Sequence, residues 1–272
     1  MRHARLLLTL GPALASSVLL VVVPAAPGAT RIVGAVGVNK MLRGIPQQGI
    51  ALGKPSAPVT LVEFVEPQCP GCGFWARDEF PGVIARYVRS GKVRLEYRGL
   101  SFISADSTNL LTLAQAAGEQ NKLWNVVELG YANQGSEGSG YINQAYLTAI
   151  AKAVPGLDVK KAFAQTGSSK IKASIANAEA LFEQYKINST PSLAIGRTGS
   201  TKKMTVMAKT NGQGLYDSID AALAGKPVAA RKPGFPSWAI ALIAMAAAVV
   251  ISSVIALISR SRRQPSAPHP GT

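Results

Sequence analysis

The stretch Val59–Cys72, VTLVEFVEPQCPGC, decides which fold the chain is expected to adopt. It consists of an apolar run rich in β-branched residues, a short turn, and two cysteines separated by two residues. The apolar run is typical of a buried strand. After Cys72, apolar residues recur at the spacing of an amphipathic helix, which ends at Ser90 and Gly91. Pro81 is expected to kink this helix or break its first turns. The sequence therefore predicts a strand that passes into a helix at the cysteine pair.

Cys69 and Cys72 are the only cysteines in the chain, and their placement predicts a reactive thiol. Free backbone N–H groups and the positive end of the helix dipole favour a thiolate at the first turn of a helix. A disulfide across two residues closes a small ring, and such bonds are exchangeable rather than structural. We expect Cys69 to be the exposed sulfur with a low pKa and Cys72 to be its buried partner. An inert local disulfide or a pair of packed thiols is the alternative, but neither needs this placement.

Other chemistries of paired cysteines find little support. A zinc site usually has four ligands, and the only histidines, His3 and His269, lie in opposite tails, although carboxylate ligands stay open. The same count removes a Cys–His nucleophile pair from the domain. We expect neither a metal nor another cofactor.

The strand, the Cys-Pro-Gly-Cys turn and the helix resemble the active site of thioredoxin-fold disulfide oxidoreductases. Two further segments resemble the DsbA-like branch of that family: Ala114–Trp124 its helical insertion, and Ile187–Leu193 its Thr-Pro segment. The resemblance implies an α/β thioredoxin fold with an inserted helical subdomain at about residues 106–186. It also implies that Pro191 follows a cis peptide bond and faces the cysteines.

The resemblance assigns the exchange reaction to the cysteines. A substrate thiolate attacks Cys69, and the second substrate cysteine resolves the mixed disulfide. The neighbouring residues Pro70, Gly71, Thr190 and Pro191 are expected to contact the substrate.

Two acids precede the cysteines. Glu63 lies where the family often has a buried acid, and we expect it to accept or relay a proton for Cys72. The alternative for Glu63 is an ordinary strand residue that faces solvent. Glu66 is a second candidate for this role, but its position nearer the turn predicts exposure to solvent.

Gly71 departs from the family pattern. DsbA-like oxidases often carry a histidine between the proline and the second cysteine, where it adds charge and hydrogen bonding to the thiolate. Glycine supplies only its backbone, so a weaker oxidant is expected. An oxidase is the main hypothesis for the direction of exchange. A thiol reductase or isomerase, or a redox-inert thioredoxin-like binding module, is the alternative.

The composition indicates that membrane segments accompany the domain. The chain has 272 residues, of which 47% are hydrophobic and 16% charged. The apolar run Leu6–Ala26 follows Arg2 and Arg5, so residues 1–26 are typical of an uncleaved membrane anchor or a cleaved signal peptide. Under either interpretation, the domain that contains the cysteines is exported from the cytoplasm.

A second apolar run predicts a transmembrane helix at residues 238–258. The run carries no charge, begins with Trp238, and reaches the ~20 residues that a bilayer requires. Arginines follow at once and place the basic tail, residues 259–272, in the cytoplasm by the positive-inside rule. A buried core helix is the alternative, but apolar residues occur all round this segment.

The remaining chain divides into a domain and two linkers. Residues 27–57 are rich in Gly, Pro and basic residues and are expected to form a linker, part of which could add an edge strand. Residues 58–226 form the expected DsbA-like thioredoxin domain, and residues 227–237 a second linker.

This organisation predicts a catalytic domain tethered at the cell membrane on its extracytoplasmic side, where disulfides can form and persist. The expected partners are exported cysteine-containing proteins, and the resemblance implies a quinone-linked membrane oxidase that resets the cysteines. A net charge of +15 favours contact with anionic membrane lipid. The chain lacks a basic motif interleaved with aromatic residues, so nucleic acid is not an expected partner.

Overall fold

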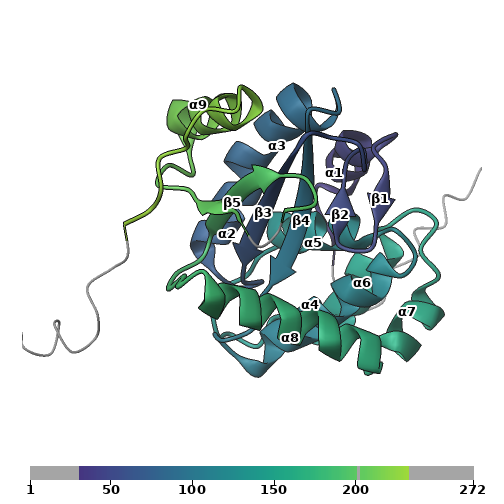
Figure 1. Cartoon of the computed structure of the whole chain (residues 1–272). Helices are drawn as coiled ribbons and strands as arrows, with labels where there is room; N and C mark the ends of the chain where they lie inside the picture. The colour runs from purple at the N-terminus through teal and green to yellow at the C-terminus, as the bar shows by residue number, and fades with distance from the viewer. Residues whose placement is uncertain (1–30, 201–202, 233–272) are drawn as a thin grey trace, which may run out of the picture.

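A six-stranded mixed sheet organises the part of the protein that the structure describes (Figure 1). The computed structural model describes residues 31–200 and 203–232. The strand order is β1-β2-β4-β3-β5-β6; β3 runs parallel to β4 and antiparallel to β5. The strands are β1 (Gln47–Gln48), β2 (Ala51–Leu52), β3 (Val59–Val65), β4 (Val93–Gly99), β5 (Ser192–Arg197) and β6 (Thr205–Val206).

Most of the described helices belong to one of two groups around the sheet. The segment after the cysteines comprises α2 (Pro70–Phe74), the π-helix η1 (Trp75–Glu79), α3 (Phe80–Val83) and the π-helix η2 (Ile84–Val88). The block between β4 and β5 comprises α4 (Ala105–Gly118), α5 (Leu123–Ala132), α6 (Gln144–Lys152), α7 (Val159–Gln165) and α8 (Ser169–Gln184). Helix α9 (Gly212–Leu223) lies at the opposite end of the molecule from this block (Figure 1). The helical insertion therefore lies where the sequence predicted it.

Side chains of β3 alternate between two cores, as the period of a strand requires. Leu61 and Val65 point into the larger core, with the helices that follow the cysteines and with α4 and α5. Val62 and Phe64 point to the opposite face, which α8 covers. The Phe64 ring contacts the rings of Phe182 and Tyr185. Because β3 is buried along its whole length, its sequence is a nearly continuous apolar run.

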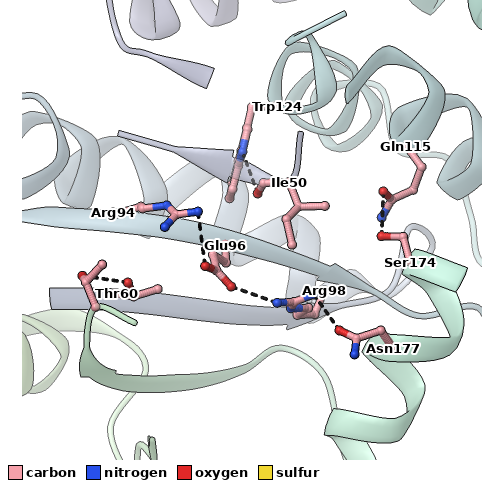
Figure 2. A network of polar contacts seen from close by, with 10 residues as sticks. Ile50, Thr60, Arg94, Glu96, Arg98, Gln115, Trp124, Ser174 and Asn177 are labelled. Atoms are coloured by element: carbon pink, nitrogen blue, oxygen red, sulfur yellow. Dashed lines mark hydrogen bonds and ion pairs between the residues drawn. The ribbon is translucent and has the colours of Figure 1, made fainter. Parts of the chain in front are cut away.

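Charged residues share the α8-facing side of β4 (Figure 2). The Glu96 carboxylate lies between Arg98, at 2.9 Å, and Arg94, at 3.4 Å. Arg98 also donates a hydrogen bond of 3.0 Å to Asn177 of α8. This ion-paired network joins the edge of the smaller core to the helical insertion.

Pro81 does not break the helix that follows the cysteines. Helical structure is continuous from Pro70 to Val88 and takes π-helical form in two places. Just before Pro81, the Phe80 N–H donates to the Trp75 carbonyl, five residues back. The wider turn accommodates the proline, which lacks an N–H and whose ring would clash in a regular α-helix.

The prediction that residues 27–57 form a linker is wrong from residue 31 onward. This segment contains helix α1 (Ala35–Leu42) as well as β1 and β2, and β2 pairs with β4. Leu42 and Leu52 are buried in the larger core. These few apolar residues among glycines and prolines complete the sheet edge, so the expected edge strand is confirmed while the tether is not.

The second linker also begins as part of the domain. The Arg231 N–H donates to the Val206 carbonyl, and the Arg231 guanidinium donates to Ser192 and Asn188. Residues 229–231 therefore lie beside the end of β6 and the two residues after it rather than in a free connection.

No helix within residues 31–200 and 203–232 is both long and apolar enough to cross a bilayer. The predicted segment at residues 1–26, the transmembrane helix at 238–258 and the tail at 259–272 lie outside the described residues.

Candidate active site at the Cys69–Cys72 turn

Both cysteines lie where β3 ends and α2 begins. Cys69 precedes the first helical residue, and its carbonyl accepts the N–H groups of Cys72 and Gly73 at 3.0 and 3.1 Å. Both residues are thiols in the structure; Cys69 is half-buried and Cys72 is fully buried. The strand-to-helix placement predicted from the sequence is present, and it separates the two sulfurs by their exposure.

The surroundings of Cys69 favour its thiolate. Its pKa falls to about 5, chiefly because the Cys72 thiol donates a hydrogen bond to the Cys69 sulfur. Partial burial opposes this fall, whereas hydrogen bonds from Thr190 and from the backbone N–H groups of Cys72 and Gly71 add to it. In the thiol form, Sγ donates to the Thr190 carbonyl at 3.4 Å. A partly exposed sulfur that is ionised at neutral pH can act as a nucleophile.

Cys72 has the opposite character. Burial raises the pKa of its thiol well above the ordinary value, and the neighbouring Cys69 raises it further. Its Sγ accepts the Glu66 N–H at 3.4 Å. At neutral pH the pair therefore consists of a Cys69 thiolate and a protonated, inaccessible Cys72.

The residues predicted to contact substrate gather around Cys69. The Thr190–Pro191 peptide bond is cis, as expected from the resemblance. A Cβ added at Gly71 would lie 3.1 Å from Pro191 Cδ and 3.8 Å from Cys69 Sγ, so these residues are neighbours. Pro70 and Gly71 are exposed and Thr190 and Pro191 are half-buried, which leaves this surface accessible.

Glu63 is a buried acid, not a solvent-facing strand residue. It is 1% exposed, and its carboxylate accepts the Trp75 indole N–H at 2.8 Å. Burial raises its pKa to about 8, an effect that the Trp75 hydrogen bond partly offsets. Glu63 therefore holds a proton at neutral pH, whereas its exchange of that proton with Cys72 stays a prediction.

The expectation that Glu66 is exposed is wrong. Glu66 is 0% exposed, and its Oε2 accepts the backbone N–H groups of Gln68 and Cys69 at 2.6 and 2.9 Å. The Glu66 carboxylate provides the acceptor that these two backbone N–H groups need before the helix begins, so the chain forms its turn around this side chain. Burial raises the pKa of Glu66.

The structure adds buried groups that the sequence did not single out. Tyr131 of α5 donates its hydroxyl to the Glu66 carbonyl at 3.2 Å. Glu128 of the same helix is 4% exposed; burial, and then the charge of Glu63, raise its pKa well above the ordinary value. Both residues lie in an apolar helix far along the chain, so no local signal marks them. Within the described ranges, no group of three or more His, Cys, Asp or Glu side chains could hold a metal ion.

Comparison with known proteins assigns the chain to a family. Residues 46–208 match a family described as thioredoxin. The chain belongs to the thioredoxin family. Two similar curated proteins are probable disulfide bond formation proteins D, from Bacillus cereus at 29% identity over 160 residues and from Bacillus anthracis at 30% over 164. Each match covers 58% of this chain and 73% of the relative.

Solved structures agree on the fold of this thioredoxin family member. Oxidised BdbD from Bacillus subtilis has a TM-score of 0.57 at 19% identity, covering 66% of this chain and 98% of BdbD. Wolbachia pipientis alpha-DsbA1 has a TM-score of 0.55 at 18% identity, covering 69% and 96%. The predicted DsbA-like thioredoxin fold with a helical insertion is confirmed, and the protein is a thiol-disulfide oxidoreductase.

Proposed function

We propose that this oxidoreductase is a membrane-tethered, extracytoplasmic oxidase that introduces disulfides into exported cysteine-containing proteins through Cys69 and Cys72. The observation that carries the proposal is the asymmetry of the pair: an accessible thiolate at Cys69 and a buried thiol at Cys72. An environment that stabilises the reduced pair makes the disulfide form a stronger oxidant. The names of the two Bacillus relatives, probable disulfide bond formation proteins, agree with this direction.

The proposed exchange balances in two steps. A substrate thiolate attacks Cys69 Sγ of the oxidised enzyme, the bond between the two enzyme sulfurs breaks, and Cys72 leaves as a thiolate that takes up a proton. A second substrate thiolate then attacks the substrate sulfur of the mixed disulfide, and Cys69 leaves as a stable thiolate. The substrate loses two electrons, which the enzyme gains.

Glu63 is the proposed proton source for Cys72. Its pKa of about 8 keeps it protonated at neutral pH, and it is enclosed with Cys72 on the larger-core side of the sheet. Donation to Cys72 would leave a glutamate that the Trp75 N–H stabilises.

The substrate is proposed to pass as an extended chain between Pro70 and Gly71 on one side and Thr190 and Pro191 on the other. The half-buried Thr190 carbonyl lies 3.4 Å from Cys69 Sγ. Gly71 has no side chain that could hydrogen bond to the Cys69 thiolate. The protein should therefore be a weaker oxidant than relatives with a histidine at this position.

The tether and the partners are proposals from the sequence. Residues 1–26 would anchor or export the chain, residues 238–258 would span the cell membrane, and residues 259–272 would lie in the cytoplasm. This topology would place anionic lipid beside the basic domain and let a quinone-linked membrane enzyme accept the electrons from the reduced pair.

Refolding of a reduced, cysteine-rich protein by the purified oxidised domain tests the proposal. Wild type should form native disulfides, whereas Cys69→Ser and Cys72→Ser, neither of which can form the enzyme disulfide, should be inactive. Equal refolding by Cys69→Ser and wild type would contradict the proposal and favour a binding module. A reduction potential near that of cytoplasmic thioredoxin, ~−270 mV, would instead favour a reductase.

A further inference from the structure

Side chains hold the backbone of Cys69 from both sides. Its N–H donates to Glu66 Oε2 at 2.9 Å, and its carbonyl accepts Gln134 Nε2 at 3.0 Å. Glu66 belongs to the turn itself, whereas Gln134 belongs to the helical insertion, just beyond the end of α5. The nucleophilic residue is therefore held partly by the subdomain that distinguishes this protein from a minimal thioredoxin fold.

Gln134 bridges two carbonyls of the turn. The same Nε2 donates to the Pro67 carbonyl at 3.1 Å, so both hydrogens of the amide are used. Because both partners are acceptors, the amide group can take only this orientation. Residues 67 and 69 are thereby tied to one point on the insertion.

Gly73 makes room for this bridge. A Cβ at Gly73 would collide with Gln134 Oε1, and it would lie 3.0 Å from Gln134 Cδ. The Gly73 N–H donates to the same Cys69 carbonyl that Gln134 contacts. Gln134 therefore packs directly against the first helical turn, and the absence of a side chain at position 73 is what permits it.

A second glutamine makes the reciprocal connection. Gln68 is fully buried; its Oε1 accepts the Gly138 N–H at 2.8 Å, and its Nε2 donates to Ser104 and Ser107. The glycine-rich loop after Gln134 is thus hydrogen bonded to the residue that precedes Cys69.

We propose that Gln134 is a positioning residue that couples the helical insertion to the Cys69 turn. By fixing the carbonyls on either side of Gln68, it sets the direction of the Gly71 and Cys72 N–H groups, which hydrogen bond to the Cys69 sulfur. The inference deepens the proposed function, on which it rests, because it names a residue outside the Cys-x-x-Cys segment that determines how well the thiolate is stabilised.

Titration of the thiolate in Gln134 variants tests this inference. In Gln134→Ala, the midpoint of thiolate absorbance should rise by about one unit, which reduces the thiolate fraction and the alkylation rate at pH 5 about fivefold. Gln134→Glu keeps the size but cannot donate when ionised, so it should shift the midpoint at least as far. Gln144→Ala, which removes an exposed contact to Thr148 within α6, is the control and should titrate like wild type.

Unchanged midpoints in Gln134→Ala and Gln134→Glu, with a low wild-type midpoint, would overturn the role of Gln134 and leave the proposed function intact. An ordinary midpoint in wild type would overturn both. A change in Tm alone is the result that a merely structural contact would give, and it would also count against positioning. If Gln134→Ala does not fold, the Gln134→Glu titration decides.

Discussion

Two chemically identical side chains acquire different roles from their positions in one turn. Cys69 precedes the helix and accepts hydrogen bonds from its free backbone N–H groups. Cys72 instead lies inside the larger core, where a charged sulfur is disfavoured. In the proposed mechanism only Cys69 would meet a substrate. Cys72 would be the internal partner that receives electrons and a proton.

Glu63 predicts a pH dependence of stability. Its pKa is raised from 4.5 to about 8, so the folded protein keeps a proton that the unfolded chain releases. The free energy of unfolding should therefore fall as the pH rises through this interval. Glu63→Gln should flatten the decline and raise stability at pH 8 by on the order of 3 kcal/mol, with little effect at pH 4.

Denaturant unfolding of both proteins across this pH range provides the measurement. Glu128 and Glu66 also have raised pKa values, so the decline should shrink rather than vanish. Parallel curves for wild type and Glu63→Gln would contradict the assignment.

Among the elements, β4 carries a charge network that faces α8. The Glu96 side chain is 9% exposed and the Arg98 side chain 12%, and Arg98 Nε already lacks a hydrogen-bond partner. Removal of the carboxylate leaves buried positive charge without compensation. The docking of α8 should therefore depend on Glu96 as well as on the apolar contact of Phe64 with Phe182.

Glu96→Gln is expected to destabilise the protein by about 2–3 kcal/mol. The matched control is Glu119→Gln, which breaks an ion pair with Lys170, a residue whose side chain is 75% exposed. This control should cost less than about 1 kcal/mol. Denaturant midpoints at equal ionic strength give the comparison, and equal losses would show that the network adds nothing.

The first helical turn after Cys69 should not tolerate a side chain at position 73. Alanine normally stabilises a helix over glycine by about 0.5–1 kcal/mol, and Gly37→Ala in α1, with open space around it, should do so. Gly73→Ala should instead destabilise the protein and raise the Cys69 midpoint, because its Cβ displaces Gln134. Combination with Gln134→Ala should relieve the part of the steric cost that Gln134 causes and leave the contact of the Cβ with Arg77 Nη1 at 2.8 Å. A double-mutant cycle measures this coupling. Additive effects would contradict the contact.

At the scale of the whole molecule, the domain starts earlier than residue 58. Leu52 is fully buried and pairs with Leu95, and Asn39 of α1 bonds to Asn125 and to the Ala153 carbonyl. These contacts connect the amino-terminal elements to both the sheet and the helical insertion.

A version of the chain that starts at residue 58 should therefore be less stable than one that starts at residue 31, and it should expose apolar surface around Leu95. Thermal unfolding and dye binding to exposed apolar surface measure the difference. Equal melting temperatures would restore the interpretation of residues 27–57 as a tether.

Much of this arrangement could be predicted, because local patterns specify it. The apolar run of β3, the cysteine spacing and the Thr-Pro segment indicated the fold and the face on which Pro191 meets Cys69. Glu66 could not be placed, because its burial follows from N–H groups that only the folded turn presents. Gln134 could not be found, since its partners lie in a segment brought close by the helical insertion.

The proposed function requires that the protein hold one accessible sulfur, Cys69, as a thiolate. The rate of alkylation of the reduced protein as a function of pH, with the modified residue identified by mass spectrometry, tests it most directly. We predict modification at Cys69 alone, with a midpoint near pH 5. A midpoint near the ordinary thiol value of ~8.5, or equal modification of Cys72, would contradict a selectively stabilised Cys69 thiolate.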